Sequence, residues 1–294
     1  MPIQTVAIMS PGEMGHAVGR ALIESGLEVI TCLKGRGELT KSFAGKAEIR
    51  DAESLETMVE EADLVLSIVP PAKSVETAAA AARAMLSAGK TPPYADCNAV
   101  SPDTTRRAGE EITRAGADYI DGGIIGGPPS TGPAPRFYVS GPKASLMSEL
   151  DGKGIVVRPI GDEIGRASGL KMCYASMTKG TLALQAAVFT TAEALGLTSE
   201  LKDELMEGRE ALYKQIENGT RRLPSVSARY IGEMEEIAAT YAAAGVTPKF
   251  HQGALDVFRF LASTSLAGET SETIDTRRTL EQAAKIFAGH LPMK

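Results

Sequence analysis

The chain has 294 residues, of which 43% are hydrophobic and 23% are charged. Such a composition is typical of a soluble globular protein and excludes global disorder, and the length favours two domains over one. The net charge of −6 argues against a nucleic-acid-binding surface.

The sequence lacks the marks of secretion, membrane insertion and metal binding. No basic stretch with a cleavable apolar run opens it, and no uncharged apolar run approaches the ~20 residues of a spanning helix. Cys32, Cys97 and Cys173 lie far apart, without the spacing of a disulfide framework or of zinc ligands. We therefore expect a cytoplasmic protein that needs no metal and contacts neither membrane nor nucleic acid.

Up to about residue 162, short runs rich in Val and Ile alternate with helix-like segments. The runs cover residues 5–9, 28–33, 64–69, 94–97, 119–124, 137–140 and 155–160, and helical spacing marks segments such as 14–25 and 73–88. Apolar runs of this length are typical of parallel strands covered on both faces. The pattern predicts an α/β fold with a doubly wound, Rossmann-type sheet in residues 1–162.

Beyond Gly161 the pattern becomes helical. A long helix is expected to start at residue 162 or 168 and to end near 195, where Gly196 is a plausible stop. Further helices are predicted at 199–219, 225–244, 247–265 and 271–289. Residues 163–294 are thus expected to form an all-helical domain for substrate binding and dimerisation, joined to the first domain by the long helix.

The first strand leads into a glycine-containing turn and then a helix. The turn reads Ser10-Pro11-Gly12-Glu13-Met14-Gly15. Ser10 replaces the first glycine of a dinucleotide-binding turn, while Gly12 and Gly15 keep the places that face the pyrophosphate and pack helix on strand. An ordinary strand-to-helix turn is the alternative. The Ser10–Gly15 segment follows the first strand of an alternating strand–helix pattern, and this position favours cofactor binding.

The end of the second strand bears on the choice between NAD and NADP. Lys34 and Arg36 stand where an acidic residue would bind the adenine ribose. Cations attract a 2′-phosphate, so we expect NADP, with NAD possible. Solvated loop cations are the alternative interpretation.

Two later strands end in residues placed at the expected ligand crevice. Val69 and Pro70 follow the run at 64–69, and Asn98 follows that at 94–97. Asn98 can donate and accept hydrogen bonds, which suits a ribose or substrate hydroxyl as well as a structural role. Ser101, before Pro102, is better explained as a helix N-cap.

Four segments in order carry a resemblance to the β-hydroxyacid dehydrogenase family, which includes 3-hydroxyisobutyrate and 6-phosphogluconate dehydrogenases. They are Ser10–Gly15, Val100-Ser101-Pro102, Asp121-Gly122-Gly123-Ile124-Ile125-Gly126-Gly127 and Gly165-Arg166-Ala167-Ser168-Gly169-Leu170-Lys171. The resemblance implies a Rossmann-type domain, a linking helix and an all-helical domain, and we expect a homodimer. The C-terminal half looks like the branch that includes phenylserine dehydrogenase-like proteins.

Lys171 matches the catalytic lysine of that family. Oxidising a secondary alcohol requires the hydroxyl proton to leave as hydride moves to the nicotinamide, and the reverse reaction needs an acid. A lysine has an unperturbed pKa of about 10.4, so it serves as a base only where burial or a nearby cation favours its neutral form. Taken alone, a lysine in a helix is more often solvated or ion-paired.

The chain departs from the family pattern at two substrate-binding positions. Ile125 replaces a serine that helps to bind the substrate carboxylate, although backbone amides at Gly126 and Gly127 can still receive an anion. In place of an asparagine one turn beyond the lysine, Tyr174 is the nearest polar candidate on the lysine's helix face. These changes favour a bulky or aryl β-hydroxy acid, or a β-hydroxy-α-amino acid.

The sequence therefore predicts an NADP-preferring dehydrogenase of a β-hydroxy acid, with Lys171 as general acid/base. Imine reduction is one alternative, although that branch replaces the lysine. A non-catalytic dinucleotide-binding regulator is another, supported by the missing serine and asparagine. His251, at a helix start, is expected to have a capping or surface role, with a place in the substrate cleft as the alternative, and His16 is expected to face outward.

Overall fold

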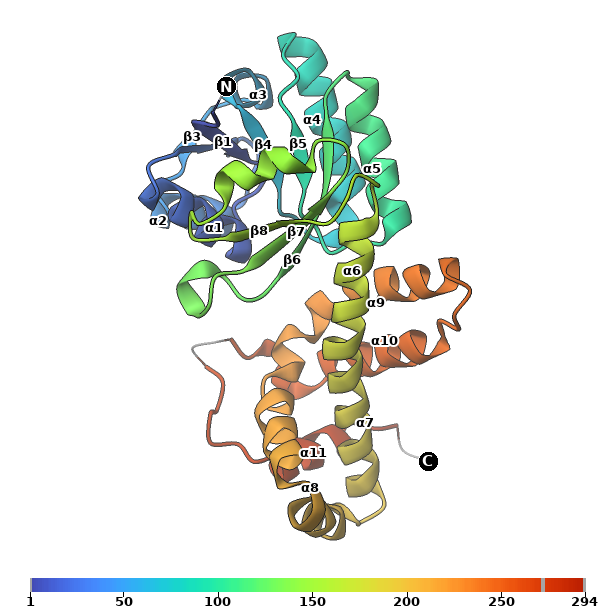
Figure 1. The fold of residues 1–294 in the computed structure, drawn as a ribbon. Coiled ribbons are helices and arrows are strands. Elements are labelled where there is room, and N and C mark those ends of the chain that lie inside the picture. The colour runs from blue at the N-terminus through green and yellow to red at the C-terminus, as the bar shows by residue number, and fades with distance from the viewer. Residues whose placement is uncertain (1, 271–272, 293–294) are drawn as a thin grey trace. The chain divides into compact units, whose positions relative to one another are not determined.

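The computed structural model describes residues 2–270 and 273–292 and divides the chain into two compact units (Figure 1). The first extends to Met172 and the second begins at Cys173. The boundary predicted near residue 162 falls in the loop before helix α6, and the assignment of functions to its two sides stays a prediction.

The first unit is built on an eight-stranded sheet with the order β3-β2-β1-β4-β5-β6-β7-β8. The strands are β1 (Thr5–Ile8), β2 (Glu28–Thr31), β3 (Arg50–Asp51), β4 (Leu64–Ser67), β5 (Tyr94–Asp96), β6 (Tyr119–Ile125), β7 (Arg136–Ser140) and β8 (Val156–Pro159). The predicted Rossmann-type fold is confirmed, with a strand at each of the seven predicted places. Sequence patterning missed β3 because its two residues are exposed and charged.

The expectation of an all-parallel sheet is wrong at one pairing. β6 and β7 are antiparallel, with Gly123 opposite Tyr138, whereas every other neighbouring pair is parallel. Only residues 126–135 join them, around the turn η2 (Pro129–Thr131). A parallel return requires a crossover of about a dozen or more residues, so this short connection reverses the chain.

Helices cover both faces of the sheet, as Figure 1 shows for α1 and α2 against α4 and α5. The helices of this unit are α1 (Glu13–Glu24), α2 (Glu38–Lys46), α3 (Leu55–Glu61), η1 (Pro71–Lys73), α4 (Ser74–Ala88), α5 (Pro102–Arg114) and η3 (Ala144–Leu150). Ser101 caps α5 by accepting a hydrogen bond from Thr104 N, which confirms the N-cap prediction.

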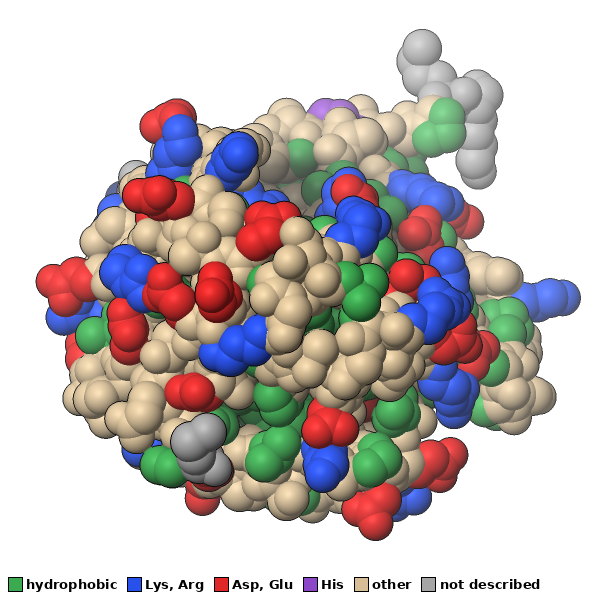
Figure 2. Space-filling view, turned by 90° about the horizontal axis from the view of Figure 1, so that it is seen from above, with side chains coloured by type: hydrophobic (Ala, Val, Ile, Leu, Met, Phe, Trp, Pro, Cys, Tyr) green, Lys and Arg blue, Asp and Glu red, His purple; other side chains and the backbone are tan. Residues whose placement is uncertain are grey.

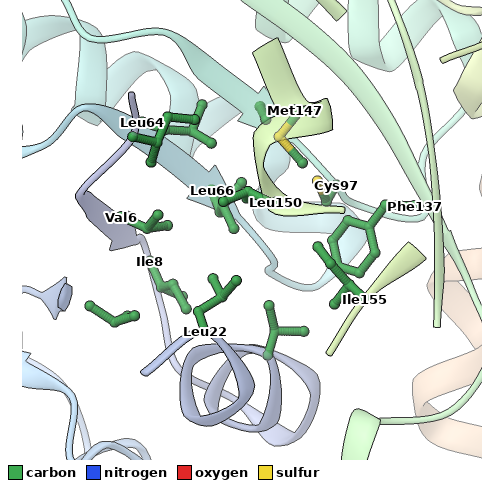
Figure 3. Close-up of a cluster of buried hydrophobic side chains, with 14 of the residues drawn as sticks. Val6, Ile8, Leu22, Leu64, Leu66, Cys97, Phe137, Met147, Leu150 and Ile155 are labelled. Atoms are coloured by element: carbon green, nitrogen blue, oxygen red, sulfur yellow. The ribbon is translucent and has the colours of Figure 1, made fainter. Parts of the chain in front are cut away.

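The alternation of side chains along β1 explains why its residues are apolar throughout. Val6 and Ile8 pack with Leu22 of α1 in one core, which Figure 3 shows together with Phe137, Met147 and Leu150. Ala7 and Met9 face the opposite core, which α3, α4 and α5 cover. Successive residues of a strand point to opposite faces, so a strand covered on both sides has no polar face.

Three helical segments follow the last strand in direct succession. They are α6 (Arg166–Ala175), the π turn η4 (Ser176–Gly180) and α7 (Thr181–Ala194). The predicted long helix is present, but it begins at Arg166 and the π turn interrupts it. It ends as predicted at Gly196, whose φ of +71° permits Leu197 N to donate to Ala192 O at 2.8 Å.

The second unit continues with α8 (Thr198–Thr220), α9 (Leu223–Ala243), α10 (Lys249–Ala262), η5 (Ser265–Gly268) and α11 (Leu280–Ala288). The prediction of a helix over 271–289 is wrong in its first half, because Thr279 and Gln282 form a capping box that starts α11 at Leu280. Residues 271–272 lie outside the described residues.

The hydropathy of the helices and the distribution of surface charge agree with the composition. None of the helices described is long and apolar enough to cross a membrane. On the face seen in Figure 2, acidic and basic side chains are interspersed, without separation into one large patch of a single sign.

Candidate active site

The predicted cofactor residues follow strands that end at one edge of the sheet. β1, β4, β5 and β6 are parallel neighbours, so their carboxyl ends lie side by side. At a strand spacing of about 4.8 Å, β6 lies roughly 14 Å from β1. The edge presents the turn at Ser10–Gly15, the residues Val69, Pro70 and Asn98, and the segment Gly126-Gly127. In open α/β sheets ligands bind at this edge.

The turn after β1 is tight on one side and open on the other. Gly12 N donates to Ser10 O at 2.9 Å, and a Cβ at Gly15 would approach that same oxygen to 2.9 Å. A Cβ added at Gly12 would meet no described protein atom within 4 Å. Gly12 is also the N-cap of α1 and has no side chain with which to cap it. The open space and the helix N-terminus fit a phosphate-bearing ligand.

The loop after β2 places its two cations differently. Lys34 is exposed, whereas the Arg36 guanidinium donates to Met9 O at 3.1 Å, beside the turn after β1. Asp51 approaches this loop from β3, which sequence reasoning missed. Its Oδ1 accepts hydrogen bonds from Leu33 N and Glu53 N, both at 3.0 Å, so the carboxylate fastens the loop.

Asn98 is buried at the end of β5 and joins two strand ends. Its Oδ1 accepts from Val69 N at 2.6 Å and its Nδ2 donates to Ser67 Oγ at 3.0 Å. These contacts favour the structural interpretation of Asn98, and its contact with a ribose stays a prediction. Burial raises the pKa of the neighbouring Asp96 to about 6, although hydrogen bonds from Ser74 and Asn98 N oppose that rise.

The close approach of α6 to β6 depends on glycine. A Cβ at Gly123 would come within 2.8 Å of Lys171 Cβ and 2.9 Å of Ala167 O, both on α6. A Cβ at Gly122 would instead meet Asp96 O and Cys97 Sγ, both at 2.9 Å. Side chains of a strand point alternately to its two faces, so Asp121, Gly123 and Ile125 lie on the same face of β6. This is the face that α6 contacts at Gly123.

Lys171 reaches the end of β6 across this contact. Its Nζ donates to Ile124 O at 2.7 Å, and the side chain is half-buried. The amine therefore lies at the carboxyl end of β6, within the first unit. Packing at Gly123 and the bond to Ile124 hold it there.

A buried carboxylate that the sequence analysis did not single out fixes the start of α6. Asp121 is fully buried on β6 and accepts hydrogen bonds from α6, α5 and β7. The donors are Gly165 N, Ala167 N, Ser168 N, Ser168 Oγ, Ser140 Oγ and Thr105 Oγ1. Its place within the family-like motif was the available signal.

The four predicted substrate residues differ in exposure. Ile125 is 4% exposed and pairs with Arg136 of β7. Gly126 and Gly127 are exposed, and Gly126 has a φ of +127°, which favours glycine. Tyr174 lies three residues beyond Lys171, in the second unit, and is 45% exposed.

The second unit contains a buried histidine, so the expectation of a surface or capping role for His251 is wrong. The side chain is 3% exposed, its Nε2 is 2.7 Å from Ser176 Oγ, and Tyr241 OH donates to the same Ser176 oxygen at 2.9 Å. Among the described residues, no hydrogen-bond partner exists for its buried Nδ1. Burial lowers the pKa of His251.

Comparison with known proteins extends these observations. Residues 5–150 match the NAD binding domain of 6-phosphogluconate dehydrogenase, and residues 192–261 match a domain of unknown function, DUF1932. An uncharacterised 28.5 kDa protein of Methanothermus fervidus is 32% identical over 181 residues, which are 62% of this chain and 68% of that protein.

Solved structures share the fold over most of the chain. The conserved protein MTH1747, whose structure is similar to 3-hydroxyacid dehydrogenases, is 26% identical with a TM-score of 0.66, over 87% of this chain and 96% of that one. A 3-hydroxyisobutyrate dehydrogenase of Mycobacterium tuberculosis, with L-serine, is 19% identical with a TM-score of 0.67, over 97% and 98%. A Myxococcus stipitatus imine reductase with NADP+ is 19% identical with a TM-score of 0.57, over 87% and 93%.

The Rossmann-type domain, its NAD-binding match and the helical second unit define the class of NAD(P)-dependent dehydrogenases and reductases. Within that class, the chain belongs to the β-hydroxyacid dehydrogenase family.

Proposed function

We propose that the protein transfers a hydride between NADP and a β-hydroxy acid, with Lys171 as the general acid/base. The observation that carries the proposal is the position of Lys171 Nζ. The amine lies 2.7 Å from Ile124 O at the carboxyl end of β6. This is the edge of the sheet at which the turn after β1 provides space for a cofactor.

The residues of that edge fit a dinucleotide. The open space beside Gly12 and the backbone of Ser10, Pro11, Glu13, Met14 and Gly15 would receive the pyrophosphate at the start of α1. Val69, Pro70 and Asn98 would line the crevice toward the nicotinamide end. When bound, the cofactor supplies a ring carbon that accepts or donates hydride.

Lys34 and Arg36 support the preference for NADP. The bond from Arg36 to Met9 O holds the guanidinium beside the turn, where a 2′-phosphate would add a charge-assisted partner. Replacing both residues with Ala should lower the ratio of NADP+ to NAD+ affinity by roughly tenfold or more. An unchanged ratio in fluorescence titrations with NADPH and NADH would contradict this assignment.

The Lys171 side chain would move the proton that accompanies hydride transfer. In alcohol oxidation the neutral amine accepts the hydroxyl proton, and in carbonyl reduction the ammonium returns it to the oxygen. The Ile124 carbonyl holds Nζ at the strand end, so little ordering of a long side chain remains for the reaction.

The substrate assignment rests on the residues that depart from the family pattern. Exposed backbone at Gly126 and Gly127 would bind the carboxylate, while Ile125 and Tyr174 would favour an apolar or aryl substituent. We therefore favour an aryl β-hydroxy acid or a β-hydroxy-α-amino acid such as phenylserine, in keeping with the phenylserine dehydrogenase-like branch.

Substitution of Lys171 tests the mechanism. Lys171→Met should lower kcat by at least about 100-fold, while NADPH affinity stays nearly unchanged. Turnover is followed at 340 nm with a panel containing phenylserine and 3-hydroxyisobutyrate. Lys143→Met, which removes an exposed lysine from a surface loop, is the control. Unaltered turnover of Lys171→Met on every substrate oxidised by the unsubstituted protein would refute the role.

Imine reduction is the second candidate, favoured by the fold shared with the imine reductase structure. The presence of Lys171 argues against it, because we expect that branch to use other proton donors. Cyclic imines tested beside the hydroxy acids separate the two activities. Tight NADPH binding without turnover of either class would indicate a regulator.

We also propose that residues 163–294 serve substrate binding and homodimerisation. The support is an apolar face on α7, where Leu184 and Val188 are 51% and 41% exposed and are followed by Leu195, 66% exposed, at the C-cap of the helix. Their spacing of four and seven residues places them on one side of the helix. Leu184→Glu with Val188→Glu should convert the dimer to a monomer in sedimentation experiments, whereas Leu86→Glu, at an exposed leucine of α4, should not.

A further inference from the structure

We propose that Asp121 is a positioning residue that sets where the Lys171 amine lies. Its hydrogen-bond donors are groups of Gly165, Ala167, Ser168, Ser140 and Thr105. The inference rests on the proposed function, because it concerns the lysine that would move the proton.

Both oxygens of Asp121 are occupied by donors from elements that meet at β6. Oδ2 accepts from Gly165 N at 2.8 Å, Ala167 N at 3.0 Å, Ser168 N at 3.2 Å and Ser140 Oγ at 2.9 Å. Oδ1 accepts from Ser168 Oγ at 2.5 Å and Thr105 Oγ1 at 3.1 Å. Four of these six bonds come from the start of α6.

The charge of this carboxylate suits its position. A buried carboxylate is costly unless hydrogen bonds and nearby positive charge compensate it. The first turn of a helix offers backbone N–H groups that lack partners within the helix, together with the positive end of the helix dipole. Asp121 therefore stabilises the start of α6, although it belongs to a strand 45 residues earlier than Arg166.

Because Asp121 belongs to β6, its hydrogen bonds to α6 also fix the position of the helix relative to that strand. Ser168 lies three residues before Lys171, so the two side chains lie on the same face of α6. Fixing Ser168 to Asp121 therefore turns Lys171 toward β6. On the strand, Asp121 lies three residues before Ile124, whose carbonyl accepts the bond from Nζ.

Strand and helix are thus joined at two points, with close packing between them. The Asp121–Ser168 bond is one, the Ile124–Lys171 bond is the other, and the Gly123 contact lies between. A translation or rotation of α6 relative to β6 would break the hydrogen bond between Asp121 and Ser168. A displacement of about 1 Å at a catalytic group costs up to roughly 100-fold in rate, so loss of this anchor should lower turnover.

The test uses Asp121→Asn in the full-length protein. The amide keeps the shape of the side chain but removes its negative charge, so the N–H groups at the start of α6 lose a charged hydrogen-bond partner. We expect kcat for phenylserine, or for whichever panel substrate is oxidised fastest, to fall roughly 10- to 100-fold. The Kd for NADPH should stay within about twofold, and amide exchange of residues 165–171 should accelerate.

Two further variants keep the test independent of general destabilisation. Ser168→Ala removes only the bond from the Ser168 hydroxyl to Asp121 Oδ1 and should lower kcat by a smaller factor than Asp121→Asn does. Asp63→Asn removes a carboxylate that accepts bonds from Gln4 N and Thr5 N at the opposite edge of the sheet. It should leave kcat and the exchange of residues 165–171 unchanged.

A double variant separates positioning from a merely structural role. If Asp121 acts through Lys171, Asp121→Asn with Lys171→Met should turn over within about twofold of Lys171→Met alone. A double variant slower by the product of the two single effects would overturn the proposal, as would an unchanged kcat in Asp121→Asn despite faster exchange. Failure of the proposed function itself is recognised separately, because Lys171→Met alone would then turn over at the unsubstituted rate.

Discussion

The turn after β1 and the segment Asp121–Gly127 are both rich in glycine, yet their glycines serve different ends. At Gly12 the space of the missing side chain is left unfilled by the described protein atoms. At Gly122 and Gly123 the corresponding space is filled by the protein, by Asp96 and Cys97 in one case and by α6 in the other.

This difference separates a binding position from a positioning one. A glycine beside open space at a helix N-terminus allows a ligand to approach the backbone. A glycine under a packed helix allows one element of the protein to approach another. The sequence pattern alone does not distinguish the two, because both appear as glycine near the end of an apolar run.

The largest effect is expected at Gly123. Gly123→Ala would place a Cβ against Lys171 Cβ and the Ala167 carbonyl, neither of which is a flexible side-chain end, so α6 must move. We expect kcat to fall roughly 100-fold, with about 1–3 kcal/mol lost from the free energy of unfolding. Steady-state kinetics and urea unfolding measure the two effects.

Gly122→Ala is the matched control for that prediction. Its Cβ would meet Asp96 O and Cys97 Sγ on the other side of β6, so stability should fall by a similar amount. At saturating NADP+ its kcat should remain close to that of the unsubstituted protein, because α6 is not displaced. Equal losses of kcat in both variants would remove the distinction between the two glycines.

A smaller effect, on binding alone, is expected at Gly12. Gly12→Ala meets no described atom within 4 Å, so the free energy of unfolding should change by less than about 0.5 kcal/mol. The added methyl group should obstruct the pyrophosphate and weaken NADPH binding by about tenfold, the value of one good hydrogen bond to a charged group. Gly45→Ala, at an equally open glycine of α2, should leave NADPH affinity unchanged. Unaltered affinity in Gly12→Ala would mean that the open space holds no phosphate.

The last prediction concerns the dependence of the free energy of unfolding on pH. The pKa of Asp96 rises from 3.8 to about 6 on folding, so between these values the native state binds more protons than the unfolded state. The stabilisation of the native state by protonated Asp96 is therefore lost as pH rises from about 4 to about 6. The pKa of His251 is lowered below 6.5 by burial, so its contribution is lost in the opposite direction, as pH falls below about 6.5.

Urea unfolding from pH 4 to 8 resolves these opposing contributions in the two units. Asp96→Asn should flatten the fall in stability between about pH 4 and 6, and His251→Gln should weaken the loss at acid pH. Identical pH profiles for the two variants and the unsubstituted protein would contradict both assignments.

Much of the first unit could be predicted from sequence because local patterns specify it. Apolar runs located seven strands, and Gly12 and Gly15 marked the turn. In the second unit, Gly196 marked the end of α7. The short β3 escaped because Arg50 and Asp51 carry no apolar signal, and the antiparallel β7 follows from the length of its connection.

The remaining features depend on partners distant in the chain. Asp121 takes its donors from residues 105, 140 and 165–168, so no local pattern shows that one carboxylate receives all six bonds. His251 is buried by Ser176 and Tyr241, which belong to other helical segments. The cytoplasmic location, the homodimer and the roles of the site residues stay predictions.

A crystal structure of the complex with NADP+ tests the central claim most directly. The account predicts the pyrophosphate over Gly12 at the start of α1. It also predicts the nicotinamide on the side of the sheet edge that carries Lys171, with room for one substrate oxygen between the amine and the ring. A cofactor bound elsewhere, or a nicotinamide separated from Lys171 by packed protein, would contradict it.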